Sequence, residues 1–110
     1  MQDDGENTFS KDQIRPLVVR SLRRSSIRKK IADYLFEISP SGSYTSEIAY
    51  NVKTTPTNVL GAMRGMGDRY KVEESLIGLN IVEQIEGKNN NVKIYKLTDF
   101  GKELISSFKK

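Results

Sequence analysis

Residues 44–66 read YTSEIAYNVKTTPTNVLGAMRGM, and this stretch predicts a pair of short helices joined by a tight turn. In its first half, Ile48 and Val52 lie one helical turn apart and give that segment an inward apolar face. Thr45 or Ser46 is expected to cap the first helix, because a side-chain oxygen at that position accepts a hydrogen bond from an N–H group that lacks a partner within the helix.

The second half of the stretch has a start signal of its own. Thr54 or Thr55 can cap a second helix, and Pro56 suits its first turn, where the missing N–H costs nothing. The side chains expected to face inward are Val59, Leu60 and Met63, and those expected to face outward are Thr57, Asn58, Gly61 and Arg64. Threonine and asparagine can bond to base edges, arginine can reach guanine or phosphate, and glycine allows close approach. This face suits a helix that reads a DNA groove, although an ordinary helix pair with a solvated face has the same pattern.

Three further segments have clear patterns. Residues 26–39 repeat apolar side chains at helical spacing and stop at Pro40, which predicts a helix. Residues 81–86 and 92–97 alternate partly, and the glycine and asparagines between them tolerate positive φ, so they predict a hairpin. Thr98 can cap a last helix. The apolar side chains of that helix are Phe100, Leu104 and Phe108.

The composition excludes several classes of function. Cysteine and histidine are absent, which removes disulfide scaffolds, thiol chemistry, zinc-finger spacing and every site built on histidine, and no acidic cluster suggests a metal. No nucleophile has a visible base and no phosphate-binding loop follows a strand, so we expect neither an enzyme nor a cofactor. No apolar run reaches the length of about 18 residues that a membrane span needs, and the start lacks a hydrophobic signal segment, so a cytoplasmic protein without membrane contact is expected.

Charge is distributed unevenly along the 110 residues. Net charge is +4, yet the first thirteen residues carry four acidic groups and one lysine. We therefore expect residues 1–13 to be a flexible acidic tail and residues 14–110 to form one small domain with a single core. Residues 15–30 hold seven basic side chains and no acidic one, which favours a polyanionic partner, with solvated cations on a helix as the alternative. The apolar group at 17–22 can extend the next helix, form its own helix, or pack on a partner chain.

The predicted order is helix, short extended segment, helix, turn, helix, two-stranded hairpin and helix. This α+β arrangement, mostly α, resembles the winged helix-turn-helix transcription regulators, in particular the small archaeal and bacterial ones. The matching segments are TSEIAYNVKTTPTNVLGAM, SLIGLNIVEQIEG and VKIYKLTDFGKELI, and the resemblance covers roughly residues 24–108. It implies a three-helix core, a two-stranded β wing and a C-terminal helix.

The resemblance also implies where DNA would bind. The recognition helix corresponds to residues 55–64 and would lie in a major groove, while the wing corresponds to residues 87–92 and would contact phosphate or the minor groove. Lysine and arginine in these segments would neutralise phosphates. The candidate DNA-binding residues are Thr45, Ser46, Lys53, Thr54, Thr55, Thr57, Asn58, Gly61, Arg64, Arg69, Lys71, Lys88, Asn89, Asn90, Asn91 and Lys93. Base reading would fall to Thr57, Asn58 and Arg64.

One segment departs from the family pattern. In typical members the recognition helix runs almost directly into the wing, whereas residues 65–74 (GMGDRYKVEE) look like an addition. This segment can lengthen the recognition helix, break it, or form a lid near DNA, and the spacing over residues 70–79 is again helical. Arg69 and Lys71 within it are either extra phosphate contacts or solvated charges.

A regulator of this family normally binds a two-fold DNA site as a homodimer. The expected dimer contacts are Leu17, Val18, Leu22, Phe100, Leu104 and Phe108, unless these side chains belong to the core. The expected function is sequence-specific binding of double-stranded DNA in transcription regulation. The alternative is a winged-helix module that binds protein or RNA without DNA specificity, and it would expose an apolar patch where a DNA reader exposes polar groups.

Overall fold

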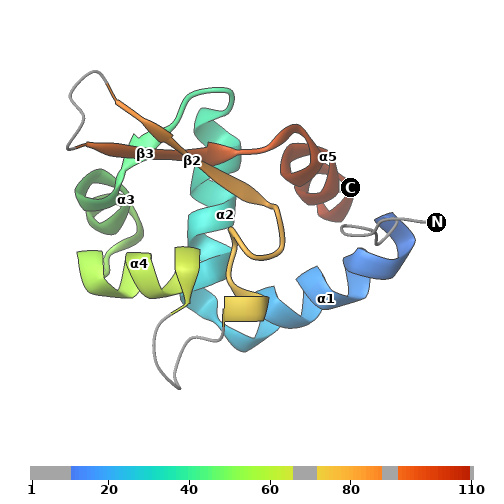
Figure 1. The fold of residues 1–110 in the computed structure, drawn as a ribbon. Helices are drawn as coiled ribbons and strands as arrows, with labels where there is room; N and C mark the ends of the chain where they lie inside the picture. The colour runs from blue at the N-terminus through green and yellow to red at the C-terminus, as the bar shows by residue number, and fades with distance from the viewer. Residues whose placement is uncertain (1–10, 66–71, 88–91, 110) are drawn as a thin grey trace.

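The computed structural model describes residues 11–65, 72–87 and 92–109 (Figure 1). Within these ranges the chain forms five α-helices, one short 3-10 helix and three strands. In chain order they are α1 (Lys11–Arg24), α2 (Ser26–Ile38), β1 (Ser43–Tyr44), α3 (Thr45–Val52), α4 (Pro56–Arg64), η1 (Val72–Glu74), β2 (Val82–Glu86), β3 (Lys93–Leu97) and α5 (Asp99–Phe108). This order and the mostly helical α+β architecture confirm the predicted winged-helix arrangement.

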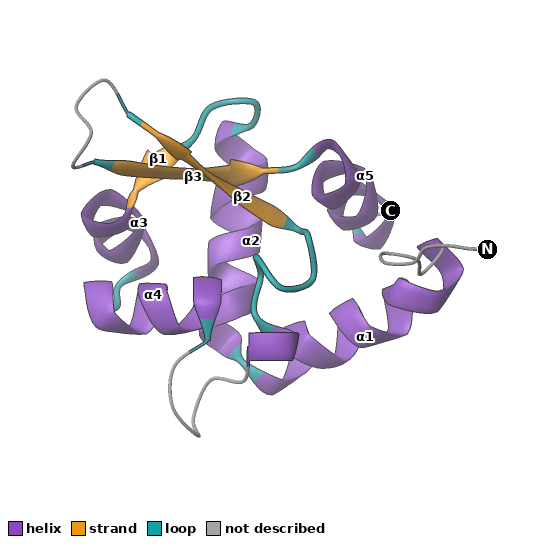
Figure 2. Ribbon diagram, in the orientation of Figure 1, coloured by secondary structure: helices purple, strands orange, loops and turns teal. Residues whose placement is uncertain are grey.

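Helix α2 is the centre of the molecule. It packs against α1, α3, α4, α5 and β3, and the other elements surround it in both ribbon views (Figures 1 and 2). Its inward side chains follow the predicted spacing: Ile31 and Leu35 are fully buried, and Ile27 and Ile38 pack partly buried against the core. The helix ends one residue before the predicted limit, where Ser39 turns to extended geometry ahead of proline.

The helix starts follow capping chemistry at two of the three predicted positions. Thr55 accepts from the backbone N–H of Asn58 at 3.1 Å at the start of α4, and Thr98 accepts from that of Gly101 at 2.8 Å at the start of α5. The predicted cap of α3 is wrong. Tyr44 occupies that position without a side-chain bond, because the chain enters α3 directly from strand β1 and Thr45 is already helical.

The three strands form one antiparallel sheet in the order β1-β3-β2. Strands β2 and β3 make the predicted hairpin, with Val82 opposite Leu97 and Glu86 opposite Lys93, and β1 pairs with the other edge of β3. Tyr95 is fully buried and faces the core together with Leu97, as the alternation predicted. Figure 2 shows strand β3 leading through a short loop to the start of α5.

Residues 17–22 lie in helix α1, which is separate from α2 and packs against it. That helix already includes residues 11–13, which the sequence placed in the acidic tail, and residues 1–10 lie outside the described ranges. Two predicted dimer contacts are corrected here. Val18 is 0% exposed and Leu104 only 5% exposed, and both belong to the core of the single chain because α1 and α5 pack their apolar sides inward.

The added segment breaks the recognition helix and does not extend it. Helix α4 ends at Gly65, whose φ of +85° suits glycine, and residues 66–71 lie outside the described ranges. Beyond η1, the backbone N–H groups of Leu76 and Ile77 donate to the carbonyls of Ala62 and Met63 at 3.0 and 2.9 Å. The predicted helix over 70–79 is therefore wrong for residues 75–79, because these bonds cap the end of α4 with a turn.

A polar clamp holds η1 against the first two helices. The carboxylate of Glu74 meets Arg24 at 2.6 Å and Arg28 at 3.6 Å, and its backbone carbonyl accepts from the Ser21 hydroxyl at 2.6 Å. Arg28 is only 3% exposed and also donates to the Ser21 carbonyl at 3.2 Å. Because a buried guanidinium needs a partner, the Glu74 side chain ties the segment that follows α4 to the junction of α1 and α2.

We predict that Glu74→Gln destabilises the chain by about 3 kcal/mol, because it leaves the buried Arg28 charge without its carboxylate. The matched control is Asp33→Asn, which breaks exposed pairs with Lys29 and Lys109 and should cost less than about 1 kcal/mol. Urea unfolding followed by circular dichroism measures both. Equal losses in the two variants would contradict the clamp.

A second prediction concerns Gly101 in the first turn of α5. A Cβ there would overlap the carbonyl group of Ile81, so the helix can approach β2 this closely only with glycine. Gly101→Ala should therefore destabilise by about 1–3 kcal/mol, although alanine ordinarily stabilises a helix relative to glycine. Thermal or urea unfolding checks this, with the exposed Lys102→Ala as control. A variant as stable as the parent would show that α5 does not need this close contact.

Candidate nucleic-acid interface

The starts of α3 and α4 lie beside the tip end of the hairpin, on one side of the molecule (Figure 1). A hollow of about 440 Å³ lies where the three come together. Its lining residues are Tyr44, Thr45, Ser46, Pro56, Val92 and Lys93. Three of the predicted DNA-binding residues, Thr45, Ser46 and Lys93, are therefore brought together although they lie almost fifty positions apart in the chain.

The outer face of α4 is polar, as expected, at its start. Thr55 and Thr57 are exposed, and Asn58 is half-buried with its amide donating to the Thr54 hydroxyl at 2.9 Å. In this state Asn58 therefore braces the turn before α4 and presents only part of its side chain outward.

The prediction for Gly61 is wrong. It is buried together with Val59, Ala62 and Met63, so it allows the packing of α4 on the core and not the approach of a DNA backbone. The buried face of α4 is wider than the sequence pattern indicated. It runs from Val59 to Met63 and includes Gly61, which lies between them in the chain.

Arg64 lies at the far end of α4, away from the hollow. The residue is exposed, but its guanidinium donates to the hydroxyl of Tyr95 at 3.3 Å. Tyr95 is buried in β3, so this bond joins the end of the recognition helix to the sheet. In this position Arg64 contributes to the fold through Tyr95.

Of the two predicted lysines, Lys93 lines this hollow and Lys53 lies at the other end of α3. Lys53 is exposed at the end of α3, where it adopts the left-handed conformation with φ of +62°. Lys93 lines the hollow and is 39% exposed, with its ammonium 3.3 Å from the Glu86 carboxylate. Because that pair is largely exposed, it is weak and can be exchanged for a phosphate.

The other predicted contacts lie outside the described residues. These are Arg69 and Lys71 in the added segment, and Lys88, Asn89, Asn90 and Asn91 at the hairpin tip. The described residues on either side of this tip are Gly87 and Val92, and the backbone N–H of Gly87 donates to the carbonyl of Val92 at 2.9 Å.

Two tyrosines on this side were missed by sequence reasoning. Tyr50 is 83% exposed and Tyr44 is 47% exposed. The signal was present, since Tyr50 follows Ser46 by one helical turn and falls opposite the buried stripe of α3. An exposed tyrosine on the first helix of the motif offers a hydroxyl and a flat ring for contact with a nucleic-acid backbone.

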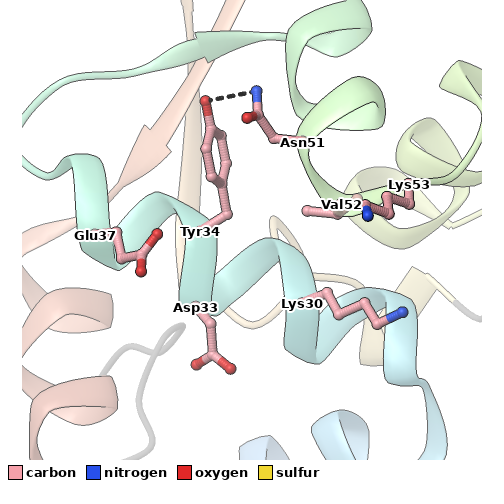
Figure 3. A pocket seen from close by; sticks show the side chains of 7 residues that line it. All are labelled: Lys30, Asp33, Tyr34, Glu37, Asn51, Val52 and Lys53. Carbon is pink, nitrogen blue, oxygen red and sulfur yellow. Dashed lines mark hydrogen bonds between the residues drawn. The ribbon is translucent and has the colours of Figure 1, made fainter.

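A second hollow, of about 320 Å³, lies between α2 and the end of α3 (Figure 3). Its charged side chains are Lys30, Lys53, Asp33 and Glu37, two of each sign. The figure shows Tyr34 and Asn51 facing each other across it, and the Asn51 amide donates to the Tyr34 hydroxyl at 3.2 Å. Because its charges balance, this hollow lacks the excess of cations that an anion site needs.

The described residues contain no cluster of three or more acidic side chains that could hold a metal ion. No helix in the described ranges combines the length and the apolar character that crossing a membrane requires.

Comparison with known proteins places the chain in a family. The family model described as EarA-like matches residues 18–108. An uncharacterized protein from Methanocaldococcus jannaschii is 47% identical over 96 residues, which covers 87% of this chain and 85% of that relative.

Solved structures share the fold at low sequence identity. MepR from S. aureus, in its complex with DNA, superposes with a TM-score of 0.63 at 15% identity and covers 89% of this chain and 74% of MepR. A mutant of ZitR from Lactococcus lactis gives a TM-score of 0.53 at 16% identity, covering 73% of this chain and 49% of ZitR. The chain has the winged helix-turn-helix fold and belongs to the EarA-like family.

Proposed function

We propose that this chain binds double-stranded DNA in a sequence-specific manner and regulates transcription. Helix α4 would enter a major groove, and the hairpin β2–β3 would contact the backbone or the minor groove. The observation that carries the proposal is the hollow where the starts of α3 and α4 meet the tip end of the hairpin, since it gathers three hydroxyl side chains and a lysine on one side. A protein of this kind would work in the cytoplasm of an archaeal or bacterial cell.

Electrostatics supports this orientation. The starts of two helices carry partial positive charge, which favours a nearby phosphate. Thr45 and Ser46 stand in the first turn of α3, and Pro56 and Thr57 stand in that of α4, so both helices present these ends to the same region. A phosphate between them would also reach Lys93. Thr57 is the exposed side chain best placed to bond a base edge.

The solved DNA complex of MepR supports the proposal at the level of fold. It shows that a chain of this architecture can engage DNA, while the side chains on the present surface are those of this chain. The polar, hydroxyl-rich start of α4 favours DNA over the alternative of a protein-binding winged helix, which would present apolar side chains there.

We further propose that the chain acts as a homodimer through α1 and α5. The two helices meet through Arg15, whose guanidinium lies 4.8 Å from the centre of the Phe108 ring and donates to Ser107 at 3.0 Å. The remaining dimer contacts of the prediction are partly buried apolar side chains of these helices: Leu17, Leu22, Phe100 and Phe108. Two-fold pairing there would leave both α4 starts free for half-sites about one DNA turn apart.

The DNA proposal predicts the effect of removing two cations. Lys53→Ala combined with Lys93→Ala should weaken binding to a random duplex and lower the salt slope by about 2, because each phosphate contact adds about 0.9. Fluorescence anisotropy across a salt series measures this. The matched control is Arg23→Ala with Lys102→Ala, which removes the same charge from exposed sites on α1 and α5 and should keep the slope. Equal changes in the two double variants would contradict the assigned face.

Thr57 provides the test of sequence specificity. Thr57→Ala should change the preferred sequence in a selection from random duplexes while leaving the salt slope unchanged, because the residue carries no charge. An unaltered preference would remove Thr57 from the reading surface, and a parent chain without any preference would leave only non-specific DNA binding.

The dimer proposal predicts that Phe108→Ser shifts the chain toward the monomer, because it removes an aromatic side chain from the α1–α5 face. Sedimentation equilibrium over a concentration series measures the mass. Lys102→Ala, an exposed residue of the same helix, is the control and should leave the dimer intact. A parent chain that is monomeric at every concentration would contradict the proposal.

A further inference from the structure

The outer face of α1 has a basic surface that the proposed DNA contacts do not use. We propose that this face docks an acidic amphipathic segment of a partner protein, in which carboxylates flank an apolar side chain. We call it the α1 basic face. It lies around a hollow of about 540 Å³, and its lining residues are Arg15, Pro16, Val19, Arg20, Arg23 and Arg24.

The cations of this face differ in what already holds them. Arg24 is paired with Glu74, and Arg15 is held over the Phe108 ring without a described carboxylate partner. Arg20 and Arg23 are exposed, and within ranges 11–65, 72–87 and 92–109 no ion pair is formed by either. Arg15, Arg20 and Arg23 therefore leave about three positive charges uncompensated by described groups on one side of a single helix.

The floor between these cations is apolar. Pro16 and Val19 are its apolar lining residues. A neighbouring hollow of about 580 Å³ shares Arg20 and Arg24, and its other lining residues are Ile14, Leu17, Glu73, Glu74, Gly78 and Leu79. Arg20 and Arg24 thus form a ridge between two hollows with apolar residues. A partner helix can place an apolar side chain in a hollow and its carboxylates on the guanidinium groups, which bind carboxylates in a two-pronged manner.

The position of this face argues against the same DNA molecule as its partner. In Figure 1, α1 lies across the molecule from the hairpin and from the starts of α3 and α4, and the longest extent of the molecule is 41 Å. A phosphate backbone also has no apolar groups to match Pro16 and Val19.

A second copy of this chain is also a poor occupant. The α1 basic face would meet an identical set of arginines across a two-fold axis, and like charges repel. The proposed dimer contacts Leu17 and Leu22 pack partly buried against the core, whereas Arg20 and Arg23 are exposed, so these two cations remain available in a dimer. An acidic protein segment is therefore the partner whose charge and shape both fit.

The test uses the full chain and a labelled synthetic helical peptide with leucine at one-turn spacing and glutamate elsewhere. Its control peptide has glutamine in place of glutamate. Arg20→Glu with Arg23→Glu should weaken binding of the acidic peptide by about tenfold or more, since charge reversal at an interface removes attraction and adds repulsion. The matched control, Lys30→Glu with Lys102→Glu, makes the same change of net charge elsewhere on the surface and should stay within about twofold of the parent.

Val19→Ser separates docking from simple charge attraction. It alters no charge, so a several-fold loss of peptide affinity supports the apolar floor, and unchanged affinity overturns it. Circular dichroism of each variant confirms that the chain is folded. Equal loss in both double-charge variants overturns the proposal, as does binding of the glutamine peptide that matches binding of the acidic one.

Two further arms decide between this partner and others. If Arg20→Glu with Arg23→Glu weakens duplex DNA binding more than the Lys30 and Lys102 control does, the face is a nucleic-acid surface and the proposal fails. If the acidic peptide binds only after residues 1–10 are removed, the chain's own acidic start is the occupant and the proposal fails. The peptide measurements do not depend on whether α4 reads DNA, so failure here is distinguishable from failure of the proposed function.

Discussion

The burial of one apolar stripe on α2 is the constraint on which the other elements depend. Ile31 and Leu35 are fully buried, and α1, α3, α4, α5 and β3 all pack around this helix. Burying each such side chain contributes about 1.5–3 kcal/mol, so this helix sets where its neighbours can lie. Helices α3 and α4 then start on the side of the molecule that holds the tip end of the β2–β3 hairpin. The clamp from Glu74 to Arg28 fixes the segment after α4 to the same centre, so the proposed reading helix is held at both its packing face and its end.

This arrangement leaves two surfaces that differ in the chemistry of their side chains. The side that holds the starts of α3 and α4 offers hydroxyls, helix N-termini and a lysine, which suit a phosphate backbone. The α1 basic face combines arginines with an apolar floor, which suits a folded acidic segment. A regulator needs both abilities, one to hold a site on DNA and one to contact other proteins. The two proposals place DNA binding and protein binding on different sides of the molecule, so a mutation can alter one activity without the other.

Local chemistry made most of the fold predictable, and contacts between distant residues account for the errors. The helix spacing of α2, the caps Thr55 and Thr98 and the hairpin were all readable, because each depends on neighbours in sequence. The missed turn at 75–79 depends on carbonyls of α4, and the burial of Gly61, Val18 and Leu104 depends on which face meets the core. For the candidate site, Thr45, Ser46 and Lys93 were predicted one by one, but their common hollow and the exposure of Tyr50 required the structure.

The most direct test of the account is to map the DNA contact on the folded chain. A nitrogen-15 labelled sample is titrated with duplex DNA, and the amide chemical shifts are followed by NMR. The account predicts the largest changes at residues 44–46, 53–58 and 92–93, with little change along α1. If the largest shift changes lie along α1 and α5, or if no amide shift changes at low salt, the starts of α3 and α4 and the tip end of the hairpin do not form a DNA-binding face.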